Sequence, residues 1–158
     1  MAENLNISFE EGYKEFTINN DPKRILRVNV GDIGLIDRME KSIKDMKEKI
    51  SEIDDIKIDV NGDAESTLEE EAEAVRKVNS IMRKSFDSIF YPGASNIVFG
   101  KQNPIALVNG VSIYELFLEA FAKTVKPMIE AEAKHSEDRV NKYKDQYDKV
   151  AAFKDVAK

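Results

Sequence analysis

The chain has 158 residues, a net charge of −6 and no cysteine. This length is enough for one domain with a buried core, and a hydrophobic share of 42% beside a charged share of 34% argues against disorder throughout. The lack of cysteine excludes a disulfide framework, thiolate metal sites and cysteine nucleophiles.

The charge is unevenly distributed. Residues 32–73 contain fifteen acidic and six basic residues, whereas residues 126–158 contain seven acidic and eight basic ones. Without a basic stripe we expect no nucleic-acid partner, and a basic protein surface suits the acidic half better. The first residues are acidic and polar where a signal peptide is basic and then apolar, and no apolar run approaches the ~20 residues of a membrane span. We therefore expect a soluble, unexported protein with no membrane partner.

The N-terminal pattern predicts an arm followed by a β-hairpin. Residues 1–12 show no period and are expected to form a flexible arm. Phe16 and Ile18 alternate with polar residues, the turn formers of residues 19–22 follow, and a second alternation runs through Leu26, Val28 and Val30. Because an isolated hairpin is marginal in water, we expect its apolar face to pack on the helix that follows.

A first amphipathic helix of about 21 residues is predicted from Asp32, which is placed as the N-cap. Its apolar positions step by three and four: Ile36, Met39, Ile43, Met46, Ile50 and Ile53. This stripe fits either packing within the domain or an intermolecular coiled-coil seam.

Residues 54–66 form an acidic connector with a turn at Asn61-Gly62-Asp63, and alternation at residues 56–60 allows a short strand. The turn superficially resembles a calcium loop. With Gly62 at the invariant turn, however, Lys57 takes the first ligand position and Leu68 the twelfth, where carboxylates are needed. A polar turn is the better interpretation.

A second helix is predicted to begin at a capping box formed by Thr67 and Glu70. Its expected apolar stripe comprises Leu68, Ala72, Val75, Val78 or Asn79, Met82, Phe86 and Ile89.

That helix should stop at a corner within residues 85–100. The corner residues are Phe90, Tyr91, Pro92 and Gly93, with an echo at Phe99 and Gly100. Aromatic residues around a Pro-Gly stop are typical of a packed corner, and a catalytic loop would need more titratable groups than the single Asp87. We expect Phe86, Phe90 and Phe99 in the core, with Tyr91 covering it.

The last third of the chain predicts two further helices. A capping box at Ser112 and Glu115 opens the first of them, which runs to Val125. Pro127 is expected to be the first residue of a long polar helix that runs towards Phe153. The apolar positions of that helix are few and evenly spaced: Val140, Tyr143, Tyr147 and Val150. This stripe fits either a partner-binding surface or docking onto its own domain.

Together these elements predict a mainly α fold with a small N-terminal antiparallel β-hairpin (α+β), about four helices and a long polar C-terminal helix. The expected parts are the arm over residues 1–12, a hairpin plus helical domain over residues 13–125, and a C-terminal helix or extension over residues 126–158. His135 is the only histidine, glycine-rich phosphate-binding patterns are absent, and most carboxylates lie in solvated charge runs. We therefore predict a non-enzymatic protein with no catalytic residue, metal or cofactor.

The order of these elements resembles that of the small tail assembly chaperones of siphophages and prophages of Gram-positive hosts. The resemblance covers residues 13 to about 125 and rests on the hairpin at residues 15–19, the Met- and Ile-striped helix, the corner at residues 87–100, and the Phe- and Leu-rich segment at residues 114–121. The chain departs from the family pattern at Tyr91-Pro92-Gly93, where glycine would directly follow Phe90.

The resemblance implies a non-enzymatic protein in the cytoplasm of the bacterial host. It implies two partners, the tape measure protein and the tail tube protein, and a role in keeping the first soluble and recruiting the second. Two other classes remain open: a structural minor tail or connector protein of the virion, and a small phage regulatory protein. A homo-oligomer is also left open.

Overall fold

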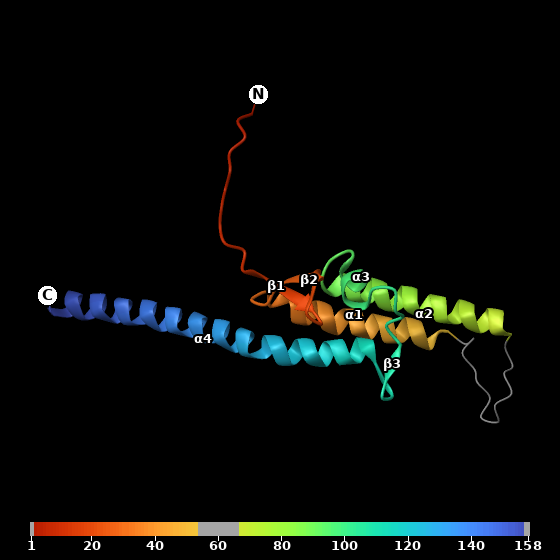
Figure 1. The fold of residues 1–158 in the computed structure, drawn as a ribbon. Coiled ribbons are helices and arrows are strands. Elements are labelled where there is room, and N and C mark those ends of the chain that lie inside the picture. Colours follow the sequence, from red (N-terminus) through yellow and green to blue (C-terminus); the bar gives the residue numbers. More distant parts are fainter. Residues whose placement is uncertain (1, 54–66, 157–158) are drawn as a thin grey trace. The chain divides into compact units, whose positions relative to one another are not determined.

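The computed structural model describes residues 2–53 and 67–156, with side chains through Ala151. It divides into two compact units, Met1–Glu119 and Ala120–Lys158. The described residues contain four helices and an N-terminal antiparallel hairpin, and the last helix is long and polar (Figure 1). The predicted α+β class, with helices dominating, is confirmed.

The N-terminal hairpin consists of β1 (Tyr13–Ile18) and β2 (Asp21–Asn29). Asn19 and Asn20 join the strands with φ values of 51° and 59°, the left-handed backbone that tight hairpin turns require and that asparagine tolerates. Phe16 lies opposite Leu26, which is fully buried. Residues 2–12, before β1, form neither helix nor strand, and their side chains are exposed.

Helix α1 (Gly34–Ser51) begins two residues after the predicted N-cap. The cap position belongs to Ile33, which makes no side-chain cap, but the Asp32 carboxylate does accept the Gly34 N–H at 2.9 Å. Leu35 is buried while Ile36 is 61% exposed, so the predicted stripe is wrong at its first position. One residue turns a helix by about 100°, and here it is Leu35 that lies on the buried side.

Helix α2 (Leu68–Ile89) packs alongside α1. Its capping box is confirmed, because the Thr67 hydroxyl accepts the Glu70 N–H at 3.2 Å and the Glu70 carboxylate accepts the Thr67 N–H at 3.4 Å. The predicted stripe holds from Val78 onwards, but Val75 is 42% exposed and Ala74 is fully buried instead. The buried face of α2 therefore continues from Val78 to Ala74, four residues earlier, and not to Val75, three residues earlier. The predicted connector between α1 and α2 lies outside the described residues.

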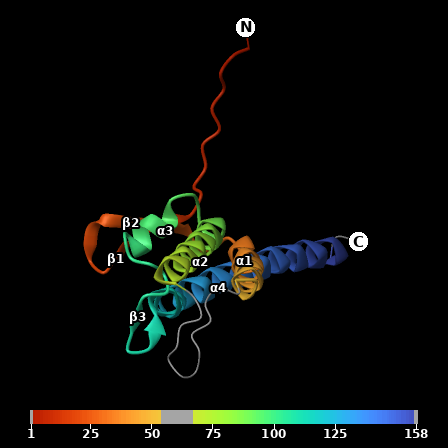
Figure 2. The same cartoon turned by 90° about the vertical axis from the view of Figure 1, so that its right-hand side faces the viewer.

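Helix α3 (Ala94–Phe99) occupies the segment expected to be a short apolar turn. It packs against both α2 and β2, and Figure 2 shows it beside the hairpin. The hairpin therefore packs on α3, which lies far along the chain and was not expected as its partner.

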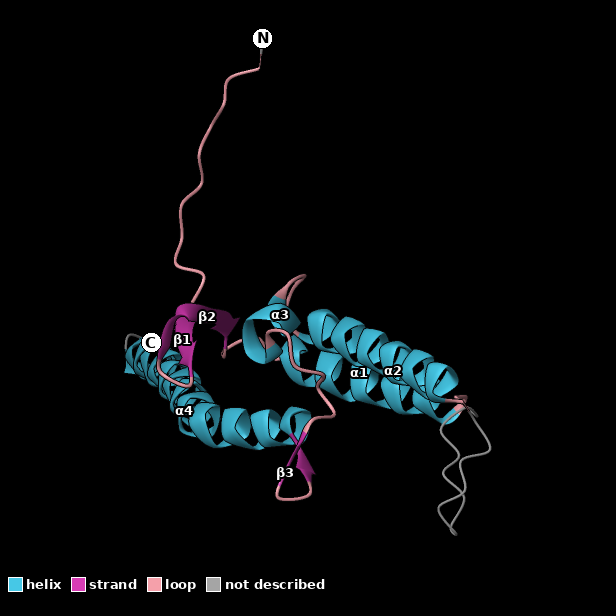
Figure 3. Cartoon of the chain, turned by 45° about the vertical axis from the view of Figure 1, so that its right-hand side comes forward, coloured by secondary structure: helices cyan, strands magenta, loops and turns pink. Residues whose placement is uncertain are grey.

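A second small hairpin follows α3. Its strands are β3 (Leu107–Val108) and β4 (Val111–Ser112), and they pair antiparallel across Asn109-Gly110 (Figure 3). The φ values of 51° and 82° at these two residues explain why Asn-Gly stands there. The sequence predicted the turn but not the strands.

Helix α4 (Ile113–Val156) begins after Ser112, whose hydroxyl accepts the Glu115 N–H at 3.2 Å. It continues through Pro127, so the predicted helix start at that residue is wrong. Proline offers no N–H to the carbonyl four residues earlier, a cost of about 3 kcal/mol in a helix interior. The alanine-, lysine- and glutamate-rich flanks are strong helix formers and offset that cost.

Candidate functional site

Five aromatic rings gather in the first unit where the corner meets the start of α4. Phe86 is at the centre, with ring-centroid distances of 4.8 Å to Phe90, 5.0 Å to Phe99, 5.3 Å to Phe117 and 6.0 Å to Tyr114. Phe86 is fully buried and Phe99 nearly so, as expected for core residues, whereas Phe90, which was also expected in the core, is half-buried. Tilted and edge-to-face pairs of this kind add about 0.5–1.5 kcal/mol each beyond apolar burial, so the corner is a strongly packed centre.

The backbone of the corner depends on its two glycines. Gly93 has φ 92° and Gly100 has φ 59° with ψ −128°. A Cβ at either position would meet no atom within 4 Å, so backbone conformation, and not space, requires glycine there. Between Gly93 and α2, the Tyr91 carbonyl accepts the Ala94 N–H at 3.1 Å and closes the turn.

Asp87, the one acidic residue of the corner, caps the short helix. Its Oδ1 accepts the Ser95 N–H at 2.8 Å, in the first turn of α3. A carboxylate at the positive end of a helix satisfies an otherwise unpaired donor. Asp87 therefore has a structural partner within its own chain.

Two arginines hold helix ends from neighbouring elements. From β2, the Arg24 guanidinium donates to the carbonyl of Ile97 at 2.8 Å and to that of Val98. From α1, Arg38 Nε donates to the Ile89 carbonyl at 3.1 Å. These carbonyls belong to the last turns of α3 and α2, where a positive charge is favourable.

Arg83 holds the segment that leaves α3. Its Nη2 donates to the carbonyls of Gly100 and Gln102, both at 2.7 Å. Its Nε and Nη1 donate to the side-chain oxygens of Asn79 at 2.9 Å and Asn96 at 2.8 Å. All four acceptors are neutral, so these contacts fix the guanidinium without neutralising it.

Further contacts tie the hairpin and α1 to the corner. The Tyr91 hydroxyl accepts the Arg27 N–H at 3.1 Å. Arg38 also pairs with Asp32 at 3.0 Å. The hydrogen bond from Arg38, followed by that from the Gly34 N–H, holds the pKa of Asp32 below its ordinary value.

One polar group beside the ring cluster is buried. The Ser85 hydroxyl donates to the Ser42 carbonyl at 2.9 Å and links α2 to α1. Burial raises the pKa of the Tyr114 hydroxyl, and Ser85 opposes the rise. Within the described residues the Tyr114 oxygen is buried and makes no hydrogen bond of normal geometry.

The structure thus places the six corner residues within a framework of ring packing and hydrogen bonds. The arginines of that framework were not predicted from the sequence. Arg24, Arg38 and Arg83 follow no helical or strand period, because each acts on a distant backbone carbonyl. One sequence signal for these residues is the presence of arginine on elements predicted to be amphipathic. This signal is weak.

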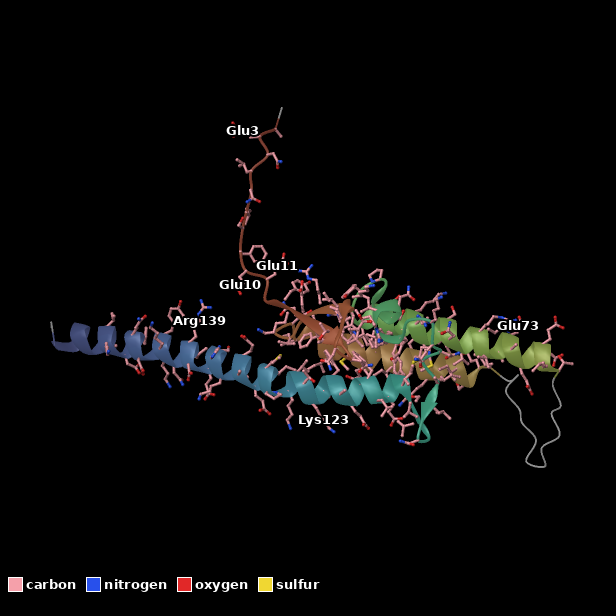
Figure 4. The ribbon with its side chains drawn as sticks, viewed as in Figure 1. Glu3, Glu10, Glu11, Glu73, Lys123 and Arg139 are labelled. Atoms are coloured by element: carbon pink, nitrogen blue, oxygen red, sulfur yellow. The ribbon has the colours of Figure 1, made fainter. Side chains whose placement is uncertain are left out.

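The tyrosine stripe lies in the second unit, on α4. Its members are highly exposed: Val140 62%, Tyr143 61%, Tyr147 74% and Val150 55%. Arg139 lies over the Tyr143 ring at 5.7 Å from its centroid and is labelled in Figure 4. At 100° per residue the four side chains share one face of the helix. They form an uninterrupted apolar and aromatic strip.

The single histidine and the carboxylates of the described residues do not gather at one site. His135 is exposed on α4. Among residues 2–53 and 67–156, no three His, Asp or Glu side chains are grouped so that they could hold a metal ion. In the same residues, no helix is both long and apolar enough to cross a membrane.

Comparison with known proteins places the chain in a family. Residues 23–151 match the family described as a family of unknown function, DUF6673. The chain belongs to the DUF6673 family. The matched region runs from β2 to α4 and includes both the corner and the tyrosine stripe of this DUF6673 protein. No curated protein and no solved structure matches it.

Proposed function

We propose that this DUF6673 protein is a phage tail assembly chaperone. In this role it binds the tape measure protein in the cytoplasm of the bacterial host and helps to recruit tail tube subunits, without catalysing a reaction. The resemblance in the order of elements supports the assignment to tail assembly chaperones. The exposed stripe of Val140, Tyr143, Tyr147 and Val150 is the observation that carries the binding role.

The stripe has the chemistry of a helix-binding surface. Its spacings of three, four and three match the a and d positions of a coiled-coil seam. The other side of the helix is polar, with Asp138, Lys142, Asp145 and Lys149 together with Asn141, so α4 presents one face to a partner and the other to water. Tyrosine supplies large contact area with few rotatable bonds and is enriched at interfaces. A long helical partner such as a tape measure protein would fit it.

The stripe is also short, which suits a chaperone. Two heptads of seam are fewer than the three or four that stable coiled coils sustain. Binding through four positions on each chaperone should therefore be reversible. Many copies along one tape measure helix would shield it, and each copy could leave when tube subunits arrive.

Co-expression with the tape measure protein of the phage or prophage that carries this gene tests the proposal. We expect the chaperone to raise the soluble fraction of the tape measure protein and to co-purify with it. A variant carrying Tyr143→Ala and Tyr147→Ala should reduce recovery of the complex about tenfold or more, which corresponds to a loss of about 1.4 kcal/mol. Alanine is a strong helix former, so α4 itself should persist, and circular dichroism checks this.

The matched control carries Lys142→Ala and Asp145→Ala on the opposite face, which leaves the net charge unchanged. It should behave like the wild type. Equal solubility of the tape measure protein alone, with no complex recovered, would overturn the proposal. Finding the chain in purified virions would favour a minor tail or connector protein, and DNA binding at physiological salt would favour a regulatory protein.

A further inference from the structure

A basic depression lies in the first unit beside α2. It is open, has a volume of about 460 Å³ and is bordered by α2, α3 and the loop after α3. Its lining contains three cations, three amides and no carboxylate: Val75, Arg76, Asn79, Arg83, Asn96, Gly100, Lys101 and Asn103. Because the lining is positively charged, although the whole protein has a net charge of −6, the depression should bind an acidic group.

The three cations of the depression keep their charge available. Arg83 is fixed by neutral acceptors only, as described above. Arg76 and Lys101 are exposed, and within the described residues neither makes a hydrogen bond or an ion pair. The positive charge is therefore positioned but not neutralised by the part of the chain that the structure describes.

The first half of α2 carries the complementary charge. Glu69 and Glu73 are exposed and lie on the same side of the helix as Arg76, seven and three residues before it. Figure 4 shows Glu73 near the beginning of α2. Glu73 approaches Lys77 only to 3.9 Å, with both side chains more than half exposed, a weak pair. One side of α2 is thus acidic first and basic afterwards.

We propose that a second copy of this chain occupies the depression, with the two α2 helices antiparallel about a two-fold axis. A two-fold interface joins residue i to residue j and residue j to residue i. Because the second copy of α2 runs in the opposite direction, an acidic residue of one copy can lie opposite a basic residue of the other. With the axis passing between residues 74 and 75, Glu73 of each copy faces Arg76 of the other.

Exposed apolar side chains border this surface. Val75 is 42% exposed and Leu68 is 83% exposed, and both lie about 80–100° round the helix from Arg76, at the edge of the proposed contact. Because ion pairs at an exposed surface are screened by salt, the association should weaken as ionic strength rises.

Charge reversal at two positions gives a decisive test. In sedimentation-velocity runs at low salt, the wild type should form a dimer, whereas Arg76→Glu and Glu73→Arg should each remain monomeric, because like charges then meet across the axis. An equimolar mixture of the two variants should form a heterodimer, since both contacts then become opposite-charge pairs. The double variant in one chain should also dimerise.

Control variants Lys47→Glu and Glu48→Arg make the same charge changes on α1, which contributes no residue to the depression. They should dimerise like the wild type, and circular dichroism should show all variants folded. A wild type that stays monomeric would overturn the proposal. So would a dimer insensitive to both reversals, or single variants that do not recover on mixing.

Discussion

At the scale of single residues, the corner is organised around Phe86. Its ring is fully buried and packs against four other rings, one just after α2, one in α3 and two in α4. The turn that brings those rings together depends on Gly93, whose φ of 92° is disfavoured for any residue with a Cβ. Packing and backbone conformation thus act on the same few residues.

The Gly93→Ala substitution should therefore lower the free energy of unfolding by about 1–2 kcal/mol, the usual cost of a left-handed conformation for an L-residue. The matched control is Gly31→Ala. Gly31 lacks the left-handed φ, and an added Cβ would come no closer than 3.4 Å to Asn29 Oδ1, so its unfolding free energy should be unchanged or raised by up to about 1 kcal/mol. Urea titrations of both proteins measure the difference, and equal effects would contradict the assignment.

At the scale of elements, the helices are joined through their ends. The Arg38 side chain on α1 donates to the Ile89 carbonyl at the end of α2. It also forms an ion pair with Asp32, which precedes the first turn of α1. The Arg38–Asp32 ion pair therefore lies where α1, the end of α2 and the segment between β2 and α1 meet. Its pH dependence follows from the lowered pKa of Asp32.

A carboxyl group whose pKa is lowered on folding contributes stability above its unfolded-state pKa, and this contribution is lost as the pH falls through the folded-state pKa. Asp32→Asn should thus lower the urea midpoint at pH 7, and the gap to the wild type should close as the pH drops below the ordinary value of 3.8.

Asp37→Asn serves as the control for that pH series, because it removes a carboxylate from the first turn of the same helix, together with an exposed pair with Lys41, and leaves the Arg38 contacts in place. It should change the midpoint little at any pH. A gap between Asp32→Asn and the wild type that persists in acid would show that the Asp32 charge is not what stabilises the junction.

Element prediction from the sequence succeeded where the signal was local. The capping box at Thr67 and Glu70 and the turns at Asn19-Asn20 and Asn109-Gly110 are formed by neighbouring residues, and the structure has them all. It failed where long-range packing or context decided. Pro127 looked like a helix start because that is its commonest helical position, but strong helix formers on both sides carry the helix through it.

The candidate site divides in the same way. The aromatic corner residues and the tyrosine stripe could be named from composition and spacing. The arginine contacts at Arg24, Arg38 and Arg83, and the depression beside α2, could not, since they join segments up to 74 residues apart. Only the folded chain brings those groups together.

At the scale of the whole molecule, the two proposed interactions use different units. Self-association would involve α2 in the first unit, and partner binding would involve the α4 stripe in the second. Self-association depends on charged residues of α2, whereas partner binding depends on the apolar stripe of α4. The two interactions should therefore respond differently to salt and to mutation.

We therefore expect Arg76→Glu to co-purify with the tape measure protein as well as the wild type does, although it remains monomeric. The Tyr143→Ala and Tyr147→Ala variant should still dimerise. Size-exclusion chromatography with light scattering on both proteins, alone and co-expressed, measures this. Loss of both properties in either variant would contradict the separation.

The arginine contacts around the corner have a consequence for sequence drift. Each guanidinium reaches backbone carbonyls, which every amino acid supplies, so a substitution at the half-buried Ile97 or the exposed Gln102 changes a side chain but leaves the acceptor in place. The constraint instead falls on the donors, Arg24, Arg38 and Arg83, and on the glycines that aim the carbonyls. The corner can therefore vary much of its surface without losing its shape.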